Sequence, residues 1–406
     1  MGAADGREAS LACHECGEAV TAPIAYACHR CGGPLVLVTP PASPSQLRAE
    51  PHAQGIWRYR RALPATDAAI CLGEGATPVV ALGEQVAGQP GLLAKLEQLN
   101  PTLSFKDRAM ALGASVALDL GAAGLVLAST GNAAVSAAAY ASAASLPCTI
   151  YCAASTSGSD KLELSRALGA HVVAVDGDYS TAHARAVGME DQGWLNVTTT
   201  YRNPYLTEGH RTVAYELVDA LGDRRIDAVV VPVGAGPLLR GIANGFADLL
   251  AVDAIEAAPR MIGVQGQGCS PLAHAWDQGP RESWLASLES WGPAAPTLAG
   301  AIADPLRGYE REGLLTLASV AGTGGDLVAV ADAEIRKAAR ALGRGGYLVE
   351  ATAAATLAAV PRLAERGAIE PGDTVVLVLT GHGMKERAIL DEMRAEARAP
   401  EEAGST

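Results

Sequence analysis

Short apolar runs alternate with helix-like segments through the middle of the chain, and this alternation limits the possible folds most strongly. The expected strands are residues 125–129, 148–152 and 171–175, and the expected helices between them are residues 133–144 and 160–168. Strands that alternate with helices form a parallel sheet whose crossovers are right-handed. The sequence therefore predicts an α/β fold.

A second group of apolar runs lies outside this region and predicts another sheet. These runs are residues 91–96, 228–233, 261–265 and 374–379. Two open, mostly parallel sheets would then face each other across a cleft. Ligands of such folds bind at the carboxyl ends of the strands, so we expect functional residues directly after the strands.

The segment Asn100-Pro-Thr-Leu-Ser-Phe-Lys106-Asp-Arg108 leads from one of these strands into an Ala-rich helical pattern that begins at Ala109. Lys106 would thus lie near the start of a helix, where the helix dipole and the unpaired N–H groups are electropositive. A lysine is unfavourable there unless its amine is used. A solvated surface lysine is the alternative interpretation.

Three glycine-bearing turns follow further along the chain, namely Ser129-Thr-Gly-Asn132, Val233-Gly-Ala-Gly236 and Leu379-Thr-Gly-His-Gly383. Glycines let backbone N–H groups approach an anion closely, and a helix start adds its dipole. Each turn alone has a simpler explanation, because the first could merely cap a helix and glycine turns are common in parallel sheets. Together with Lys106 they predict one ligand site built from four pieces of chain.

Four of the eight cysteines form two Cys-x-x-Cys pairs near the N-terminus, Cys13 with Cys16 and Cys28 with Cys31. Each pair can direct two thiolates at one ion, and the glycine after each pair permits a tight turn. We therefore expect a small ribbon that holds a structural zinc with four thiolates and no open position. A ribbon that folds without metal, or an adventitious disulfide, is the alternative.

Composition excludes several classes of partner. The formal net charge of −13 and the lack of a Lys/Arg cluster disfavour nucleic acid, whose affinity rests on many cationic contacts. No run reaches the roughly 18 uninterrupted apolar residues of a membrane span, and the first ten residues lack the pattern of a signal peptide. The other cysteines lie in apolar segments, as expected of reduced core residues. We expect a cytoplasmic protein without a membrane or nucleic-acid partner.

The four motifs around Lys106 and the glycine turns also occur in a known order. Ser104-Phe-Lys-Asp-Arg108 and the three turns resemble the motifs of the threonine synthase-like branch of the fold-type II pyridoxal phosphate enzymes, in the superfamily of the tryptophan synthase beta subunit. The resemblance covers roughly residues 70 to 390. It implies pyridoxal 5'-phosphate as the cofactor, a small amino acid as the substrate and a homodimer.

The resemblance implies a role for each motif residue. Lys106 would form the Schiff base and move the proton at the substrate's α carbon. Asn132 would lie beside the cofactor's phenolic oxygen, and Thr380 beside its ring nitrogen, where a neutral hydroxyl leaves a weaker electron sink. The other residues implied to bind the cofactor are Phe105, Val233, Gly234, Ala235, Gly236, Pro237 and Leu238, and those implied to bind the substrate are Ser129, Thr130, Gly131 and Ala133.

Two departures from the family pattern concern the substrate. Leu206 occupies a position where threonine synthases commonly have an arginine that binds the phosphate of O-phosphohomoserine, and Pro237-Leu238 replaces an Asn-bearing form of the glycine loop. Loss of a charge-assisted bidentate contact costs about 1.5–3 kcal/mol. Cations that could compensate are Arg202, Arg211, Lys161 and Arg240. Glu350-Ala-Thr352 also replaces the more usual Glu-Pro-Ser, which would reshape the edge of the cofactor site.

These patterns predict how the chain is divided. We expect a disordered tail at 1–10, a zinc-ribbon-like module at 11–38, a Pro-rich linker at 39–66, a large cofactor-binding domain at 67–110 and 222–390, a small substrate-side domain at 111–221 and a disordered tail at 391–406.

The expected activity is elimination or replacement at the β or γ carbon of a small amino acid, with threonine synthesis from O-phosphohomoserine as the nearest named activity. A serine or threonine ammonia-lyase and a cysteate synthase-like β-replacement synthase are the alternatives among enzymes. A catalytically silent zinc-ribbon binding protein on the same scaffold is the alternative of another class.

Overall fold

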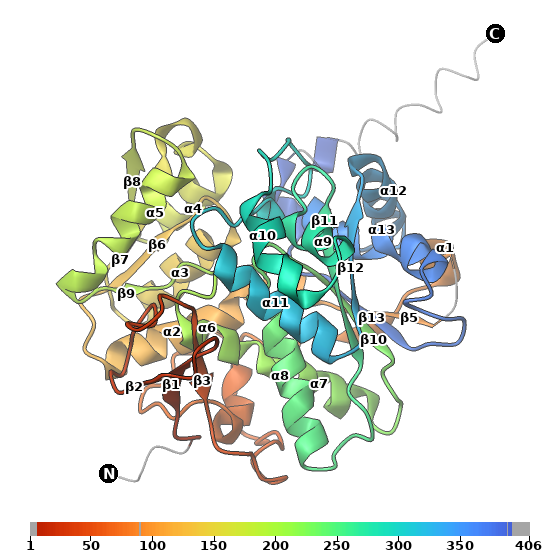
Figure 1. The fold of residues 1–406 in the computed structure, drawn as a ribbon, viewed down its shortest axis with the longest axis horizontal. Helices are drawn as coiled ribbons and strands as arrows, with labels where there is room; N and C mark the ends of the chain where they lie inside the picture. Colours follow the sequence, from red (N-terminus) through yellow and green to blue (C-terminus); the bar gives the residue numbers. More distant parts are fainter. Residues whose placement is uncertain (1–5, 89–90, 388, 392–406) are drawn as a thin grey trace.

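Three sheets organise residues 6–88, 91–387 and 389–391, the part of the chain that the computed structural model describes. A four-stranded sheet lies on the left of Figure 1 and a six-stranded sheet on the right. The third is a three-stranded antiparallel sheet, in the order β2-β1-β3, formed by β1 (Ser10–Cys13), β2 (Ala19–Val20) and β3 (Leu35–Val38). Both larger sheets carry helices, so the predicted α/β class is confirmed.

The four-stranded sheet is parallel throughout, in the order β8-β7-β6-β9. Its strands are β6 (Leu125–Ala128), β7 (Cys148–Ala153), β8 (His171–Val175) and β9 (Leu195–Asn196), and the helices between them are α3 (Asn132–Ala143), α4 (Asp160–Ala167) and α5 (Tyr179–Val187). The three strands expected in this region agree with the observed ones to within one residue at each end. The short β9 was not predicted.

Alternation along β6 explains how helices cover both faces of this sheet. Leu125 and Leu127 pack into a core that contains residues of α2 (Lys106–Asp119) and α3, whereas Val126 and Ala128 pack with Ala182 of α5. Successive side chains of a strand point to opposite faces, so a strand buried on both faces is apolar at every position. This explains why the run 125–128 carries no polar residue.

The six-stranded sheet has the order β12-β11-β10-β13-β5-β4, and only β4 is antiparallel to its neighbour. Its strands are β4 (Val79–Ala81), β5 (Leu92–Lys95), β10 (Ala228–Pro232), β11 (Arg260–Gly266), β12 (Asp326–Val330) and β13 (Val375–Val378). The helices α12 (Asp332–Arg344) and α13 (Ala351–Glu365) cover one face, and α7 (Arg211–Leu221), α8 (Pro237–Ala251) and α11 (Glu310–Gly322) cover the other.

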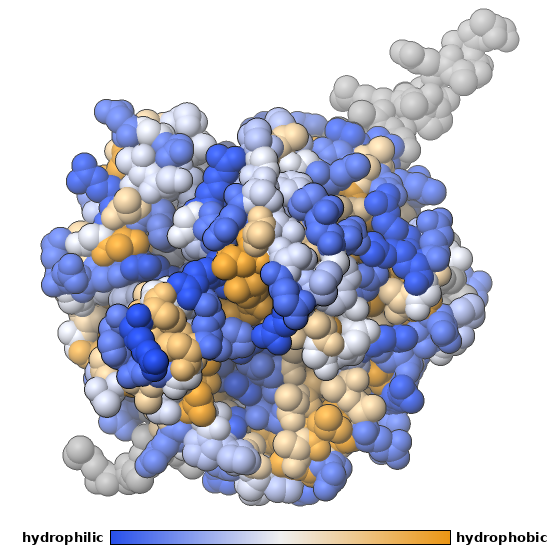
Figure 2. Space-filling view, in the orientation of Figure 1, coloured by the Kyte–Doolittle hydropathy of each residue, from blue (hydrophilic) through white to orange (hydrophobic). Residues whose placement is uncertain are grey.

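Shorter elements connect these layers. The remaining α-helices are α1 (Glu84–Ala87), α6 (Pro204–Gly209), α9 (Pro271–Asp277) and α10 (Trp284–Glu289). Short 3-10 turns are η1 (Gly55–Ala62), η2 (Glu97–Leu99), η3 (Ala154–Thr156), η4 (Glu190–Gln192), η5 (Arg281–Ser283), η6 (Gly300–Ile302) and η7 (Gly383–Lys385). Figure 2 shows that hydrophilic residues cover most of the visible face, with scattered apolar patches. Among the described helices, none is long and apolar enough to cross a membrane.

The expected tail at residues 1–10 is wrong for its second half. Ser10 begins β1, and the buried Arg7 forms an ion pair with Asp248, with an Nη1–Oδ1 distance of 3.1 Å. A buried guanidinium needs such a partner, and Arg7 also donates to the carbonyl oxygen of Pro40. Residues 1–5 and 392–406 of the expected tails lie outside the described residues.

The expected linker at 39–66 contains a buried segment. Within η1, Ile56 and Trp57 pack into the core beside the four-stranded sheet, whereas Tyr59 and Ala62 pack into the core of the six-stranded sheet. Prolines suggested an extended connection, but the large apolar side chains gain more from burial than the segment gains from staying solvated. Residues 55–63 therefore join the two halves of the molecule, and the linker prediction is wrong for them.

Helix α7 packs differently from the expected division at residue 221. Val213, Ala214 and Leu217 lie in the core between the six-stranded sheet and α8, not in the core beside the four-stranded sheet. Leu206 of the preceding α6 belongs to the latter core. We propose that the small domain ends between these two helices.

Candidate active site

A cavity of about 570 Å³ lies at the carboxyl ends of parallel strands from both larger sheets. Its walls include Ser129 after β6, Gly234 after β10 and Thr380 after β13. The four motifs predicted to form one site all reach this cavity. Of the fourteen residues predicted to bind cofactor or substrate, all except Val233 line it. Val233 is 1% exposed and packs in the core behind the glycine loop.

Lys106 lies at the first position of α2, as the sequence predicted. Its Nζ donates a hydrogen bond to Thr199 Oγ1 at 2.8 Å and lies 4.6 Å from the ring centroid of Phe105. Burial lowers the pKa of the Lys106 amine to about 8, against the opposing effect of the Asp304 carboxylate. A lowered pKa increases the fraction of the amine that is in its neutral, nucleophilic form near neutral pH.

Two residues after Lys106, Arg108 anchors the lysine segment in a buried network of four charges. Arg108 binds Glu97, with an Nη2–Oε1 distance of 2.7 Å, and Glu216, with an Nη1–Oε1 distance of 2.7 Å. Lys95 Nζ binds the other oxygen of Glu216 at 2.6 Å. All four side chains are at most 4% exposed. Burial opposes ionisation of Glu216, but the charges of Arg108 and Lys95 outweigh it and lower the pKa of this carboxyl to about 2.

The glycine loop after β10 has a conformation that only glycine adopts easily. Gly236 has φ of +104°, and a Cβ there would stand 2.2 Å from Thr316 Oγ1. Pro237 then occupies the first turn of α8, whose opening N–H groups have no partner within the helix. Loop and helix start together form a site for an anion.

Asn132 at the start of α3 has one unsatisfied atom. Its Nδ2 donates to Glu350 Oε2 at 2.7 Å, whereas Oδ1 is buried and has no hydrogen-bond partner within the described chain. Lys161 pairs with the other oxygen of Glu350 at 2.7 Å. A buried amide oxygen without a partner is rare and suggests that a ligand group completes the site.

Thr380 follows β13 and is held beside the lysine segment, since its carbonyl oxygen accepts a hydrogen bond from the N–H of Phe105 at 3.1 Å. A side chain at the next residue, Gly381, would collide with Glu350 Oε2 at 2.1 Å. His382 Nδ1 instead accepts a hydrogen bond from the N–H of Met384 at 3.2 Å, and His382 does not line the cavity. His382 therefore stabilises its own turn and does not take part in the cavity wall.

Three further walls of the cavity were not predicted. They are residues 178–180 at the start of α5, residues 198–200 after β9, and residues 300–305 with Arg307 and Tyr309. Thr199, the partner of Lys106, could have been found, because its threonine run follows a strand of the parallel sheet as Ser129 does. The segment 300–309 follows no strand, so no pattern signalled its position.

The position of Leu206 corrects our interpretation of the substrate pocket. Leu206 is 2% exposed, packs beside the four-stranded sheet and does not line the cavity, and a Cβ on Gly113 of α2 would meet its Cδ2 at 2.8 Å. An arginine at this position would therefore enter an apolar core.

The proposed replacement cations are also engaged elsewhere. Arg202 pairs with Glu190, with an Nε–Oε1 distance of 2.5 Å, and Arg211 pairs with Glu208 and Asp248. Arg240 donates to Ser319 Oγ at 3.2 Å, and Lys161 is bound to Glu350. Arg307, which was not predicted, is exposed and lines the cavity.

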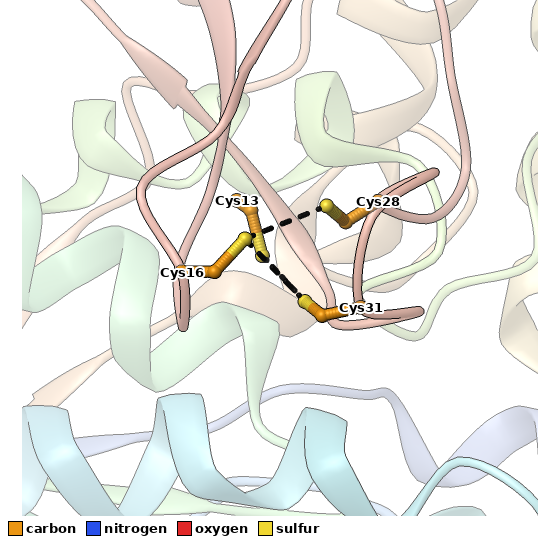
Figure 3. A group of neighbouring side chains, drawn as sticks. All are labelled: Cys13, Cys16, Cys28 and Cys31. Carbon is orange, nitrogen blue, oxygen red and sulfur yellow. Dashed lines mark hydrogen bonds between the residues drawn. The ribbon is translucent and has the colours of Figure 1, made fainter.

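The four N-terminal cysteines converge as their spacing predicted. Their sulfur atoms point toward one another from two turns (Figure 3), with distances of 3.5 Å for Cys13–Cys31, 3.7 Å for Cys16–Cys28 and 3.5 Å for Cys16–Cys31. A tetrahedral zinc with Zn–S bonds of about 2.3 Å separates its sulfurs by about 3.8 Å. The cluster therefore has the donor set and the size for a zinc ion.

The ribbon contacts both halves of the protein. Arg311 of α11 donates to Glu15 Oε1 at 2.8 Å and to the carbonyl oxygen of Cys31 at 2.5 Å. On the other side, Tyr26 accepts a hydrogen bond from the N–H of Asn196 in β9 at 2.9 Å.

Comparisons with known proteins agree with this geometry. A family model described as "Pyridoxal-phosphate dependent enzyme" matches residues 70–381. A threonine synthase of Methanocaldococcus jannaschii is 31% identical over 337 residues, which are 82% of this chain and 81% of that protein. Among solved structures, a threonine deaminase isoform of Solanum lycopersicum has a TM-score of 0.63 at 22% identity over 79% of this chain and 88% of that chain. A maize serine racemase has a TM-score of 0.64 at 21% identity over 79% and 94%.

Proposed function

The chain belongs to the pyridoxal-phosphate dependent enzyme family, and we propose that it catalyses elimination or replacement at the β or γ carbon of a small amino acid. The observation that carries this proposal is the meeting of the Lys106 amine, the glycine loop and Thr380 in one cavity. Their sequence order matches the family, and their geometry supplies an amine, an anion site and a neutral hydroxyl.

The residues of the cavity fit the cofactor. The loop Gly234–Leu238 and the start of α8 would hold its phosphate, because these residues line the cavity and the opening N–H groups of α8 have no partner within the helix. Asn132, whose buried Oδ1 has no partner in the described chain, and Thr380 would face its ring. When bound, pyridoxal phosphate withdraws electrons from the carbon atoms of an attached amino acid.

The chain's own groups would then divide the remaining work. Lys106 would hold the cofactor and, once released, move the proton at the substrate's α carbon. The N–H groups and hydroxyls of residues 129–133 would bind the substrate carboxylate. Thr380 carries no charge, which favours loss of a leaving group over transamination.

Threonine synthesis from O-phosphohomoserine is the nearest named activity, because relatives about 30% identical carry that name. Four cations considered as phosphate ligands are bound to other groups of the protein. This observation favours, as the second candidate, a serine or threonine ammonia-lyase or a β-replacement synthase. A silent zinc-ribbon scaffold is disfavoured by the lowered pKa of Lys106 within a built cavity.

The test is a product and absorbance screen of the cofactor-loaded protein against O-phosphohomoserine, O-phosphoserine, threonine and serine. We expect turnover of at least one of the four, with release of phosphate, ammonia or a replacement product. Absence of any spectral or chemical change with all four would contradict the proposed function.

We also propose that the four cysteines bind a structural zinc, and we expect about one zinc per chain. Cys13→Ser should lower the zinc content to near zero and lower the melting temperature, because the ribbon would lose a metal-dependent part of its stability. Cys71→Ser, outside the cluster, is the control and should retain the metal. Metal analysis that finds no zinc, together with free alkylation of all four native thiols, would leave a ribbon that folds without metal.

The described cysteines are all free, which supports the proposal of a reducing, cytoplasmic location. The family resemblance supports a homodimer, which sedimentation equilibrium would measure.

A further inference from the structure

One carboxylate in the cavity is held in place through only one of its oxygens. Asp304 Oδ1 accepts hydrogen bonds from the hydroxyl of Tyr309 at 2.7 Å and from the N–H of Leu306 at 2.9 Å. No hydrogen bond from the described residues reaches Oδ2, which lies 3.9 Å from the point where a Cβ of Gly234 would stand. Asp304 thus offers an oriented acceptor to the cavity.

Elements of both sheets position this acceptor. Leu306, two residues after Asp304, is buried and has φ of +58°, a conformation that leucine rarely adopts and that the hydrogen bond to Asp304 supports. The ring of Tyr309 lies 5.9 Å from that of His183 in α5, and His183 lies 6.1 Å from Tyr179, which also lines the cavity. Strained backbone held by side chains from two elements is typical of a functional site.

The other charged residues of the cavity bear on which kind of substrate side chain Asp304 can bind. Glu350 is bound to Lys161, so its charge is largely offset. Burial raises the pKa of the Asp304 carboxyl, against the lowering effects of its hydrogen bonds to Tyr309 and Leu306 and of the Lys106 charge, and Asp304 in turn opposes the burial that lowers the pKa of Lys106. Arg307 lines the cavity but is exposed, and no described ion pair includes it. Among the described residues, the cavity thus offers a substrate phosphate a fixed carboxylate and, apart from Lys106, only an exposed arginine as a cation.

We propose that Asp304 selects the substrate's side chain: its free oxygen accepts a hydrogen bond from an uncharged hydroxyl at the β or γ carbon and repels a phosphorylated one. This inference rests on the proposed function, because it assumes that Lys106, the glycine loop, Asn132 and Thr380 hold the cofactor. With residues 129–133 assigned to the carboxylate, the polar walls left for the side chain are Asp304 with Tyr309, residues 178–180 and residues 198–200. Asp178 is exposed and accepts a hydrogen bond from the N–H of Thr181, which leaves Asp304 as the oriented carboxylate. The preferred substrate class is then an unphosphorylated hydroxy amino acid.

The test compares serine with O-phosphoserine, which share one carbon skeleton and differ only by the phosphate. In the cofactor-loaded enzyme, Asp304→Asn should raise the ratio of kcat/KM for O-phosphoserine to that for serine by about ten- to a hundredfold. Tyr309→Phe, which removes one donor to Oδ1, should shift the ratio in the same direction by less. Glu310→Gln is the matched control, because Glu310 carries the same charge in the same segment, accepts from the N–H of Gly308 and does not line the cavity.

Dissociation constants from the visible absorbance change give the same ratio where turnover is slow. An unchanged ratio in Asp304→Asn would overturn the inference while leaving the proposed function intact. So would an equal shift in Glu310→Gln, or a change confined to the cofactor's dissociation constant, which would place Asp304 against the phosphate loop. No response of the wild-type enzyme to either amino acid would overturn the inference, and the proposed function would fall with it only if O-phosphohomoserine and threonine also gave no response.

Discussion

Replacement of Lys106 by alanine should abolish the absorbance band of the lysine-bound cofactor and reduce turnover by roughly 10³-fold or more. General acid–base catalysis alone contributes roughly 10²–10⁴-fold, and covalent attachment adds to it. The fold should persist, because among the described residues the Lys106 amine bonds only to Thr199, and the proposed phosphate site lies on other elements. Circular dichroism and absorbance spectroscopy with steady-state kinetics measure these effects.

Lys385 provides the matched lysine control. It lies near the same segment and donates to the carbonyl oxygen of Thr102 at 2.6 Å, but it does not line the cavity. Lys385→Ala should therefore keep the absorbance band. A Lys106→Ala protein that retained both the band and the activity would remove Lys106 from the site.

Replacement of Glu216 by glutamine should destabilise the protein by about 3–5 kcal/mol, because it leaves two buried cations with one carboxylate. Arg108 and Lys95 both bind Glu216 and are fully buried, so neither can recover its hydration. The free energy of unfolding from urea titration measures the loss. Activity should fall as well, since Arg108 fixes the start of α2 on which Lys106 lies.

Two variants test whether the loss arises from charge balance. Lys95→Met combined with Glu216→Gln removes one charge of each sign and should lose less stability than Glu216→Gln alone. Glu163→Gln breaks an exposed pair with Arg166 and should change the free energy of unfolding by about 0.5 kcal/mol or less. If Glu216→Gln were as mild as Glu163→Gln, the network would contribute no net stability.

The sequence predicted those parts of the site that follow a regular pattern. Strands 125–128 and 228–232 are apolar on both faces, and their carboxyl ends place Ser129 and Gly234 in one cavity because parallel strands end at one edge. Lys106 was predicted as a site residue because a lysine is electrostatically unfavourable at a helix start unless its amine is used. These patterns involve residues close together in the sequence, so they can be recognised without knowing how distant segments pack.

The missed features depend on contacts between distant segments. Asp304 reaches the cavity through a loop that crosses from η6 to α11, and nothing near it in sequence encodes that path. Leu206 was interpreted from a family position as a pocket residue, whereas packing against α2 places it in a core. The prolines of residues 39–66 suggested an extended linker, so the burial of Trp57 and Tyr59 in η1 was not expected. In each case the side chain's environment comes from elements far away along the chain.

The segment of residues 55–63 sets a lower limit on how short the chain can be made. The family match begins at residue 70, yet Ile56, Trp57 and Leu63 pack into one core and Tyr59 into the other. Still further upstream, Arg7 shares Asp248 with Arg211. A chain trimmed to residues 70–381 would expose apolar surface on both halves, because residues 55–63 pack against both cores. Residues upstream of the family match therefore contribute to the cores of both halves.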